Sequence, residues 1–535
     1  MSNLSPGVQT VEKDLTYNVQ SVTSNASGYV GFFRWGPTEQ IVAINTNEAE
    51  LVNRFGAPDS ATTGYFHAAA NYLLYSVPLY VARVQGATAV NAINQTAKDD
   101  GLTNPVVGNS FVAENFTLAG ASFIAKYPGD LGNSLKVSLC TSAGYAGWAY
   151  NKQFEYAPTG SAFNMVVIDE DGLFTGVAGT VLERYSLMTT VTGSKKPDGT
   201  SADLVEVLKQ QSNYVLAIDT TKIVFASGVY AQSFVGGVSD NDATASAASI
   251  AKCIQLFASS TVEFTRLFTS FLPVTAVTAA IDLADTRTDA VVFTAPPLAA
   301  VYNNTNRVAD IVTYFTGTLN KPSSYNFQVD NWKLVQDKYN NKSIWIPCDS
   351  DAAGLHARLF VNAEPWFSPA GLNRGQLKNV IRLAWNSSEP ERDVLYPKAI
   401  NSIVAFPGEG TVLFGDKTAL MAPSAFSRIN VRTLFIVIRK AIARAARYQL
   451  FEINDFITQA VFRNATDRYL DDVQGRRGIY RKRVVCDSTN NTPQVVDSNQ
   501  FVGSIYIDPS KTINNIRLDF VAISGSVSFE EVEGA

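Results

Sequence analysis

An amphipathic helix is predicted over residues 429–448, and it constrains the fold more than any other segment. Counted at 3.6 residues per turn from Val431, apolar side chains share one stripe and cationic side chains occupy the opposite face. The stripe requires a protein core to cover it, whereas the cationic face is free to meet an acidic surface. The stripe holds Leu434, Phe435, Ile438, Ile442 and Ala445, the opposite face holds Lys440, Arg444 and Arg447, and Arg432 and Arg439 flank it.

Length and charge exclude several classes of protein. A chain of 535 residues exceeds what one hydrophobic core organises, so two or more domains are expected. The net charge of -5 argues against a nucleic-acid binder, which needs surplus cations to neutralise phosphates. No continuous apolar run reaches the about 20 residues of a membrane helix, and the N-terminus lacks a secretory pattern. We therefore expect a soluble protein made in the cytosol, with four scattered, reduced cysteines.

Turn and capping signals predict several elements along the chain. Asn47 is placed to cap a short helix that runs to Phe55. Alternating or short apolar runs between turn residues predict the strands. The predicted strands are 28–33, 79–84, 164–169, 501–507 and 515–523, and further helices are expected over 203–210 and 246–257.

Both ends of the chain have strand character but offer little to bury. The N-terminal arm, residues 1–21, runs through Val8, Thr10 and Glu12. Such a segment needs a partner strand to be ordered. The C-terminal arm, residues 515–535, carries Leu518 and Phe520, then Val527 and Phe529 alternating in an acidic tail. Strand-like arms at both ends indicate strand exchange between subunits, and these side chains are the candidate contacts.

Three groups of residues partly match the sequence patterns of known binding or catalytic sites, but none matches such a pattern in full. Gly410 to Thr418 approaches a phosphate-binding loop, but Asp416 precedes Lys417 and an apolar run fills the spacer, so a strand ending in a turn is favoured. The acidic run 169–171 lacks the ligand spacing of a calcium loop. His67 and His356 lack a nucleophile elbow or an oxyanion loop. We predict no enzyme, cofactor or metal site, and retain a cytosolic hydrolase using His356 as a remote alternative.

The chain resembles the tail sheath proteins of contractile-tailed bacteriophages in three regions. Each motif is short, but their order extends over most of the sequence. The front region contains Ser5 to Val8, Gly31 to Pro37 and Tyr80 to Val84; the middle contains Ala125 to Asn133 and Phe234 to Gly237; the end contains Trp366 to Gly371, Arg374, Gly375 and Phe426 to Arg432. One departure is Thr433, where many relatives carry a second arginine.

The resemblance implies a mixed α/β (α+β) multidomain fold with a discontinuous main domain. The main domain is expected from 22–86 together with 343–514, the inserted outer region from 87–342, and terminal arms on either side. Subunits of this family stack as hexameric rings around a tail tube and link through their arms. Expected partners are further copies of the chain, the tube protein, and the baseplate and tail terminator proteins, without nucleic acid or membrane insertion. The expected location is the virion tail, assembled in the host cytoplasm.

A sheath that contracts must release its tube, which suits weak, screened ion pairs. Lys440, Arg444 and Arg447 are therefore the candidate tube-facing residues, by hypothesis. The alternative is that they bind carboxylates within the sheath itself. Contraction would then drive the tube through the host envelope during genome delivery. The sequence leaves open a second particle with the same mechanics, a pyocin-like bacterial contractile injection device.

Overall fold

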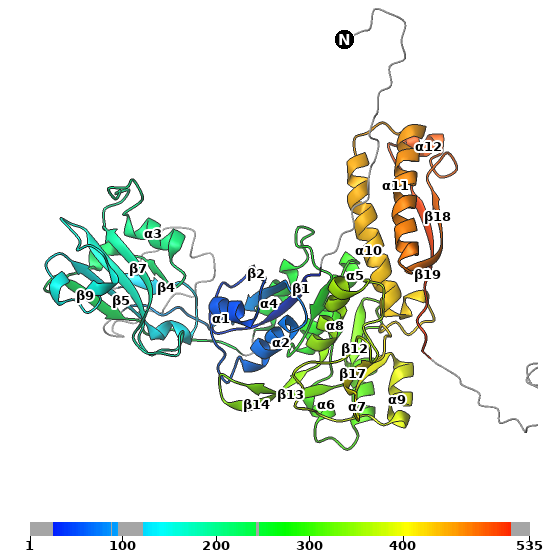
Figure 1. Cartoon of the computed structure of the whole chain (residues 1–535), viewed down its shortest axis with the longest axis horizontal. Helices are drawn as coiled ribbons and strands as arrows, with labels where there is room; N and C mark the ends of the chain where they lie inside the picture. Colours follow the sequence, from blue (N-terminus) through cyan, green and yellow to red (C-terminus); the bar gives the residue numbers. More distant parts are fainter. Residues whose placement is uncertain (1–24, 87, 95–120, 242–245, 515–535) are drawn as a thin grey trace, which may run out of the picture. The chain divides into compact units, whose positions relative to one another are not determined.

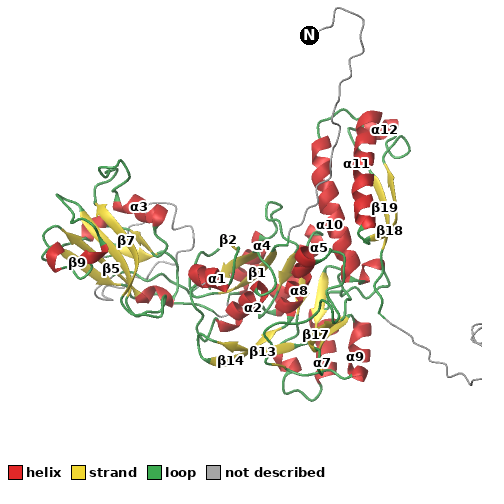
Figure 2. Cartoon of the chain, viewed as in Figure 1, coloured by secondary structure: helices red, strands yellow, loops and turns green. Residues whose placement is uncertain are grey.

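The computed structural model describes residues 25–86, 88–94, 121–241 and 246–514 (Figure 1). The chain divides into two compact units, residues 1–451 and 452–535. Helices and strands are mixed in both units, as Figure 2 shows, so the predicted mixed α/β class is confirmed. Within the described ranges, no helix combines the length and the apolar character that crossing a membrane requires.

Eight strands form the main sheet of the first unit, in the order β17-β16-β12-β11-β10-β1-β3-β2. Neighbours from β16 to β3 pair in parallel, whereas β17 and β2 pair antiparallel at the two edges. The strands are β1 (Ser27–Phe32), β2 (Ile41–Ile44), β3 (Leu79–Val84), β10 (Arg266–Phe268), β11 (Val291–Thr294), β12 (Asn326–Val329), β16 (Ile400–Phe406) and β17 (Gly410–Phe414). The strands predicted over 28–33 and 79–84 are confirmed as β1 and β3.

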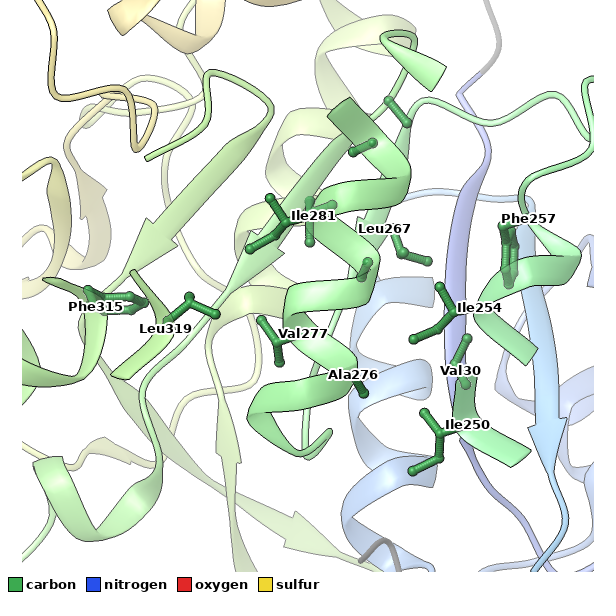
Figure 3. Packing of buried hydrophobic residues seen from close by; sticks show 14 of the residues in the cluster. Val30, Ile250, Ile254, Phe257, Leu267, Ala276, Val277, Ile281, Phe315 and Leu319 are labelled. Atoms are coloured by element: carbon green, nitrogen blue, oxygen red, sulfur yellow. The ribbon is translucent and has the colours of Figure 1, made fainter. Parts of the chain in front are cut away.

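Helices cover both faces of this sheet. On β1, Val30 packs into one hydrophobic cluster with α4 (Ala247–Leu256) and α5 (Val274–Arg287), which Figure 3 shows. The neighbouring Tyr29 faces a second cluster with α2 (Thr63–Leu73) and α8 (Asp349–Asn362). A sheet buried on both faces explains why its central strands are apolar without alternation.

The part of the first unit outside residues 121–241 is called the main body. Its remaining elements are a small sheet and several helices. A three-stranded antiparallel sheet joins β14, β13 and β15. Its strands are β13 (Trp332–Asp337), β14 (Lys342–Pro347) and β15 (Arg382–Leu383); the helices are α1 (Glu48–Phe55), α6 (Leu298–Val301), α7 (Arg307–Thr313), the π-helix η6 (Tyr314–Leu319), α9 (Glu389–Leu395), η7 (Tyr396–Lys398), η8 (Ala425–Ser427), α10 (Ile429–Ala446) and η9 (Arg447–Gln449).

The predicted cap of the first helix is confirmed and gives a local test. The Asn47 side chain accepts hydrogen bonds from the backbone N–H groups of Ala49 at 3.0 Å and Glu50 at 3.4 Å. Asn47→Ala is expected to cost about 1 kcal/mol and to accelerate hydrogen exchange of those two amides. The exposed Asn53 in the same helix provides the control, since Asn53→Ala removes no cap. Equal exchange rates in both variants would contradict this assignment.

Residues 121–241 carry their own sheets and most of a separate hydrophobic core, to which Trp35 and Ala92 also contribute. A four-stranded antiparallel sheet has the order β7-β6-β5-β9, and β4 pairs with β8. The core of this region includes Val137, Met165 and Leu208. Its elements are β4 (Phe123–Ala125), η2 (Asp130–Ser134), β5 (Leu135–Thr141), η3 (Tyr145–Gly147), η4 (Asn151–Gln153), β6 (Phe163–Asp169), β7 (Thr180–Met188), α3 (Leu204–Gln211), β8 (Val215–Ala217), η5 (Thr220–Lys222) and β9 (Val229–Ser233). Strand β6 and helices α3 and α4 match their predictions.

The predicted borders of the inserted region require a correction. Strands β10, β11 and β12 lie within 87–342, which the sequence analysis assigns to an outer insertion, yet they are central strands of the main sheet. The segment 246–342 is therefore part of the main body. Each of these strands has only three or four residues, all buried. Runs this short carry no alternation that would connect them to distant strands.

The second unit is described from Glu452 to residue 514. It contains α11 (Phe456–Gly475), β18 (Ile479–Val485), α12 (Pro493–Asp497) and β19 (Ser504–Pro509). Strands β18 and β19 pair antiparallel. The strand predicted over 501–507 thus begins and ends slightly later. The arm residues Val8, Thr10, Glu12, Leu518, Phe520, Val527 and Phe529 lie outside the described residues.

Candidate interaction surface

Helix α10 is the element that positions the candidate cations. It begins at Ile429, as predicted, and its predicted end at Tyr448 falls in the short helix η9. Leu434, Ile438 and Ile442 are buried as predicted. The core also takes Ile436 and Val437, so the buried face is wider than the predicted stripe.

Lys440, Arg444 and Arg447 line one cleft of about 410 Å³. The cleft also contains Arg287 and Arg439, so five cationic side chains face two acidic ones. The structure therefore brings together all three predicted residues. It adds a second segment, from Ala258 to Asp289, which forms the other wall.

Lys440 lies deepest of the three cations. Its ammonium group donates to the Phe264 carbonyl at 2.6 Å and pairs with Asp289 at 3.2 Å. Burial lowers the pKa of Lys440, and Asp289 opposes that effect. Burial would raise the pKa of Asp289, but hydrogen bonds and charges from Arg287 and Lys440 outweigh it and lower that pKa. Lys440 is thus held by its own chain.

Arg444 and Arg447 are the accessible pair. Arg444 places one guanidinium nitrogen at 2.7 and 2.8 Å from the two oxygens of Glu263, and both side chains are about half exposed. Arg447 is exposed on η9, and no carboxylate within the described ranges forms an ion pair with it. An exposed ion pair contributes about 0–1 kcal/mol, so Glu263 competes only weakly with an external carboxylate.

Two contributors to the cleft were not identified as cleft residues from the sequence. The period predicts Arg439 on the helix flank, yet its guanidinium lines the cleft and donates to Thr288. Arg287 comes from α5 and chelates Asp289 at 2.9 Å. By contrast, the flanking Arg432 is buried, with its guanidinium 3.8 Å from the centre of the Phe426 ring. Periodicity gives the side of a helix but not which distant segment covers it.

His356 is engaged on both ring nitrogens. Nδ1 accepts from Arg266 Nε at 2.7 Å, and Nε2 is 2.7 Å from the hydroxyl oxygen of Thr433. The residue is 1% exposed, and burial together with the Arg266 charge lowers its pKa well below the usual value. A neutral, enclosed imidazole of this kind has no access to a substrate, which removes the basis for a hydrolase built on His356. Thr433, the departure from the family pattern, serves this contact.

The segment from Gly410 to Thr418, which partly matches a phosphate-binding loop, is a strand ending in a turn, as predicted. Strand β17 occupies Gly410–Phe414. The Asp416 carboxylate then accepts from Arg428 at 2.5 Å, and the Lys417 ammonium donates to the Tyr396 carbonyl at 2.9 Å. These side chains fasten the start of α10.

The other acidic and histidine segments also have structural contacts. Asp169 accepts from the backbone N–H groups of Phe174 and Thr175 and shapes the turn after β6. Nε2 of His67 lies 3.1 Å from a carboxylate oxygen of the buried Asp337. Among the residues that the structure describes, no group of three or more acidic, histidine or cysteine side chains could hold a metal ion.

Comparison with known proteins identifies the chain's relatives. Residues 271–419 match the phage tail sheath protein central domain, and residues 421–523 match the phage tail sheath C-terminal domain. The tail sheath protein of Salmonella phage ViI is 32% identical, with 99% of this chain and 98% of that protein aligned. The tail sheath protein of Enterobacteria phage T4 is 30% identical over the whole of both chains.

Solved structures agree at the level of the fold. A sheath tail protein of Listeria innocua superposes with a TM-score of 0.57 and 13% identity, covering 92% of this chain and 97% of that one. The contracted PVC sheath of an extracellular contractile injection system gives a TM-score of 0.54 and 13% identity, covering 98% and 100%. By its full-length relatives and by its fold, this chain belongs to the phage tail sheath protein family.

Proposed function

We propose that the protein is the structural subunit of a contractile phage tail sheath. Copies would polymerise as stacked hexameric rings around the tail tube, with baseplate and terminator proteins at the ends. Contraction would drive the tube through the host envelope during genome delivery. The full-length identity of 30–32% to phage tail sheath proteins carries this proposal and favours a phage over a bacterial injection particle. The role is mechanical and not enzymatic, in the virion tail after assembly in the host cytoplasm.

Electron microscopy of the purified chain, alone and mixed with its candidate tube protein, tests the proposal. Long striated hollow cylinders are the expected result. Dispersed monomers at every salt concentration, with and without tubes, would contradict it.

The cleft lined by α10 and the segment 258–289 is the proposed tube-facing surface. Its cationic excess supports contact with acidic side chains, and exposed ion pairs are weak enough to exchange during contraction. Arg444 would exchange Glu263 for a tube carboxylate, while Arg447 would add a second contact. Lys440, held by Asp289 and Phe264, would add positive electrostatic potential to the cleft without contacting the tube itself. The competing role is cohesion within the sheath, through the pairs that Lys440 and Arg444 already form.

Reversing both accessible charges tests the tube-facing role. Arg444→Glu with Arg447→Glu is expected to leave the monomer folded and to weaken assembly on tubes by up to about thirty-fold, since each of the two lost pairs is worth up to about 1 kcal/mol. The effect should shrink at high salt. Lys152→Glu with Lys222→Glu, at exposed sites of the 121–241 region, is the matched control. Tube-dependent assembly at the wild-type level would refute the tube-facing assignment.

A further inference from the structure

A lysine, an asparagine and an aspartate meet in the buried interior of the main body. Lys333 lies on β13, Asn71 on α2 and Asp351 on α8. The Lys333 side-chain nitrogen donates at 2.8 Å to the amide oxygen of Asn71 and at 2.8 Å to Oδ1 of Asp351. The side chains of Lys333 and Asp351 are 0% exposed, and Asn71 is 3% exposed.

The surroundings of Lys333, Asn71 and Asp351 favour a covalent reaction between these side chains over a lasting ion pair. Taking both an ammonium and a carboxylate out of water costs several kcal/mol per ion, and this cost disappears when the ammonium is replaced by an uncharged amide. Neutral lysine is a nucleophile. The amine is already in contact with a carboxamide, which is an acyl group that it can attack.

The aspartate is arranged to move protons. Oδ1 of Asp351 accepts hydrogen bonds from the Lys333 side-chain nitrogen at 2.8 Å and from the Tyr75 hydroxyl at 2.7 Å. Oδ2 is buried and has no hydrogen-bond partner among the described residues. A buried carboxylate oxygen without a partner is costly, and here it belongs to the group next to the reacting atoms.

We propose that Lys333 and Asn71 form an intramolecular isopeptide bond, with Asp351 as the acid and base of the reaction. Asp351 takes a proton from the Lys333 ammonium, and the free amine attacks Cγ of Asn71. Asp351 then protonates the departing amide nitrogen and removes the second proton from the lysine nitrogen. The C–N bond to the Asn71 side-chain nitrogen breaks as the new amide forms. One neutral ammonia leaves, and the surplus proton stays on Asp351, which ends as an uncharged carboxylic acid and leaves no unpaired charge in the interior.

A lasting ion pair is the competing account of these contacts. The Lys333 ammonium would keep all three protons bonded, to Asn71, Asp351 and the Lys378 carbonyl at 2.7 Å. That account leaves the buried Oδ2 of Asp351 unexplained. The two accounts differ in covalent mass, which requires no assumption about assembly, so the inference stands or falls independently of the proposed function.

Mass spectrometry of the denatured wild-type chain decides between them. The expected mass is below the sequence mass by one ammonia, and digestion should yield one branched peptide that joins the segments around Lys333 and Asn71. Trypsin should fail to cut after Lys333. The unmodified mass, or an ammonia loss that maps to another residue, would overturn the proposal.

Variants assign the roles. Lys333→Met removes the nucleophile and should restore the full mass, whereas Lys338→Met, at an exposed lysine just after the same strand, should keep the ammonia loss. Asp351→Asn should also restore the full mass. Because this variant leaves Lys333 without a counter-ion, circular dichroism must establish that it is folded, and the wild-type mass remains decisive if it is not. Persistence of the branched peptide in folded Asp351→Asn would exclude the proposed role of Asp351.

Discussion

Arg83→Met is expected to remove about 4 kcal/mol or more of stability from the main body. Arg83 is 4% exposed, and its guanidinium donates to the carbonyls of Phe33 at 2.8 Å, Gly36 at 2.7 Å, Arg34 at 3.2 Å and Pro128 at 2.7 Å. Methionine fills much of the volume but leaves these oxygens without a donor. Each unpaired buried acceptor costs about 1–3 kcal/mol, partly recovered where water enters.

An Arg83→Lys variant shows how much the planar guanidinium group, with its several directed donors, contributes to stability. Burial lowers the pKa of Arg83 to about 9, so a buried guanidinium is retained here for its directed donors despite the desolvation cost. Arg83→Lys keeps a charge but has one nitrogen in place of the three guanidinium nitrogens that meet four carbonyls here, so it leaves at least one carbonyl without a donor. Its thermal midpoint should lie between those of the wild type and Arg83→Met. The exposed Arg54 supplies the control, and an Arg54→Met midpoint as low as that of Arg83→Met would show that the four carbonyl contacts are not responsible.

Elements with a local signal could be predicted from the sequence. The cap at Asn47 and the periodicity of 429–448 each place the determining residues within a few turns of one another, so α1 and α10 emerge close to their observed bounds. The order of the main sheet could not be predicted in this way. Strand β1 pairs with β10, more than two hundred residues later, and β10 has only three buried residues with no periodicity of its own.

The same contrast between local and long-range signals applies to the candidate site. The sequence predicted which face of α10 is cationic, because that depends only on helical geometry. It could not predict that Glu263 and Asp289 meet Arg444 and Lys440, since those pairs join positions over 150 residues apart. Nothing in the sequence points to Lys333. A lone lysine in a strand carries no signal of full burial, and only the fold brings Asn71 and Asp351 to it.

Asp330→Asn is expected to flatten the pH dependence of stability between about pH 4 and pH 7. Asp330 is 0% exposed, and its Oδ1 accepts from the Ile403 N–H at 2.9 Å. Burial raises its pKa from 3.8 to about 7, against the opposing effect of hydrogen bonds and of the Arg392 charge. The folded state therefore holds a proton that the unfolded state has already released in this interval, so the unfolding free energy falls as pH rises.

A shift of this size corresponds to about 4 kcal/mol, fully lost above the folded pKa. The amide cannot ionise, so Asp330→Asn should lose less stability than the wild type between pH 4.5 and pH 8, whatever constant offset the new NH₂ group introduces. Calorimetric midpoints of the monomer across this range provide the measurement. Asp393→Asn removes the same charge at an exposed site of α9 and should follow the wild-type slope. Parallel curves for Asp330→Asn and wild type would mean that Asp330 is ionised in the folded protein throughout, with the Arg392 charge and the Ile403 N–H outweighing its burial.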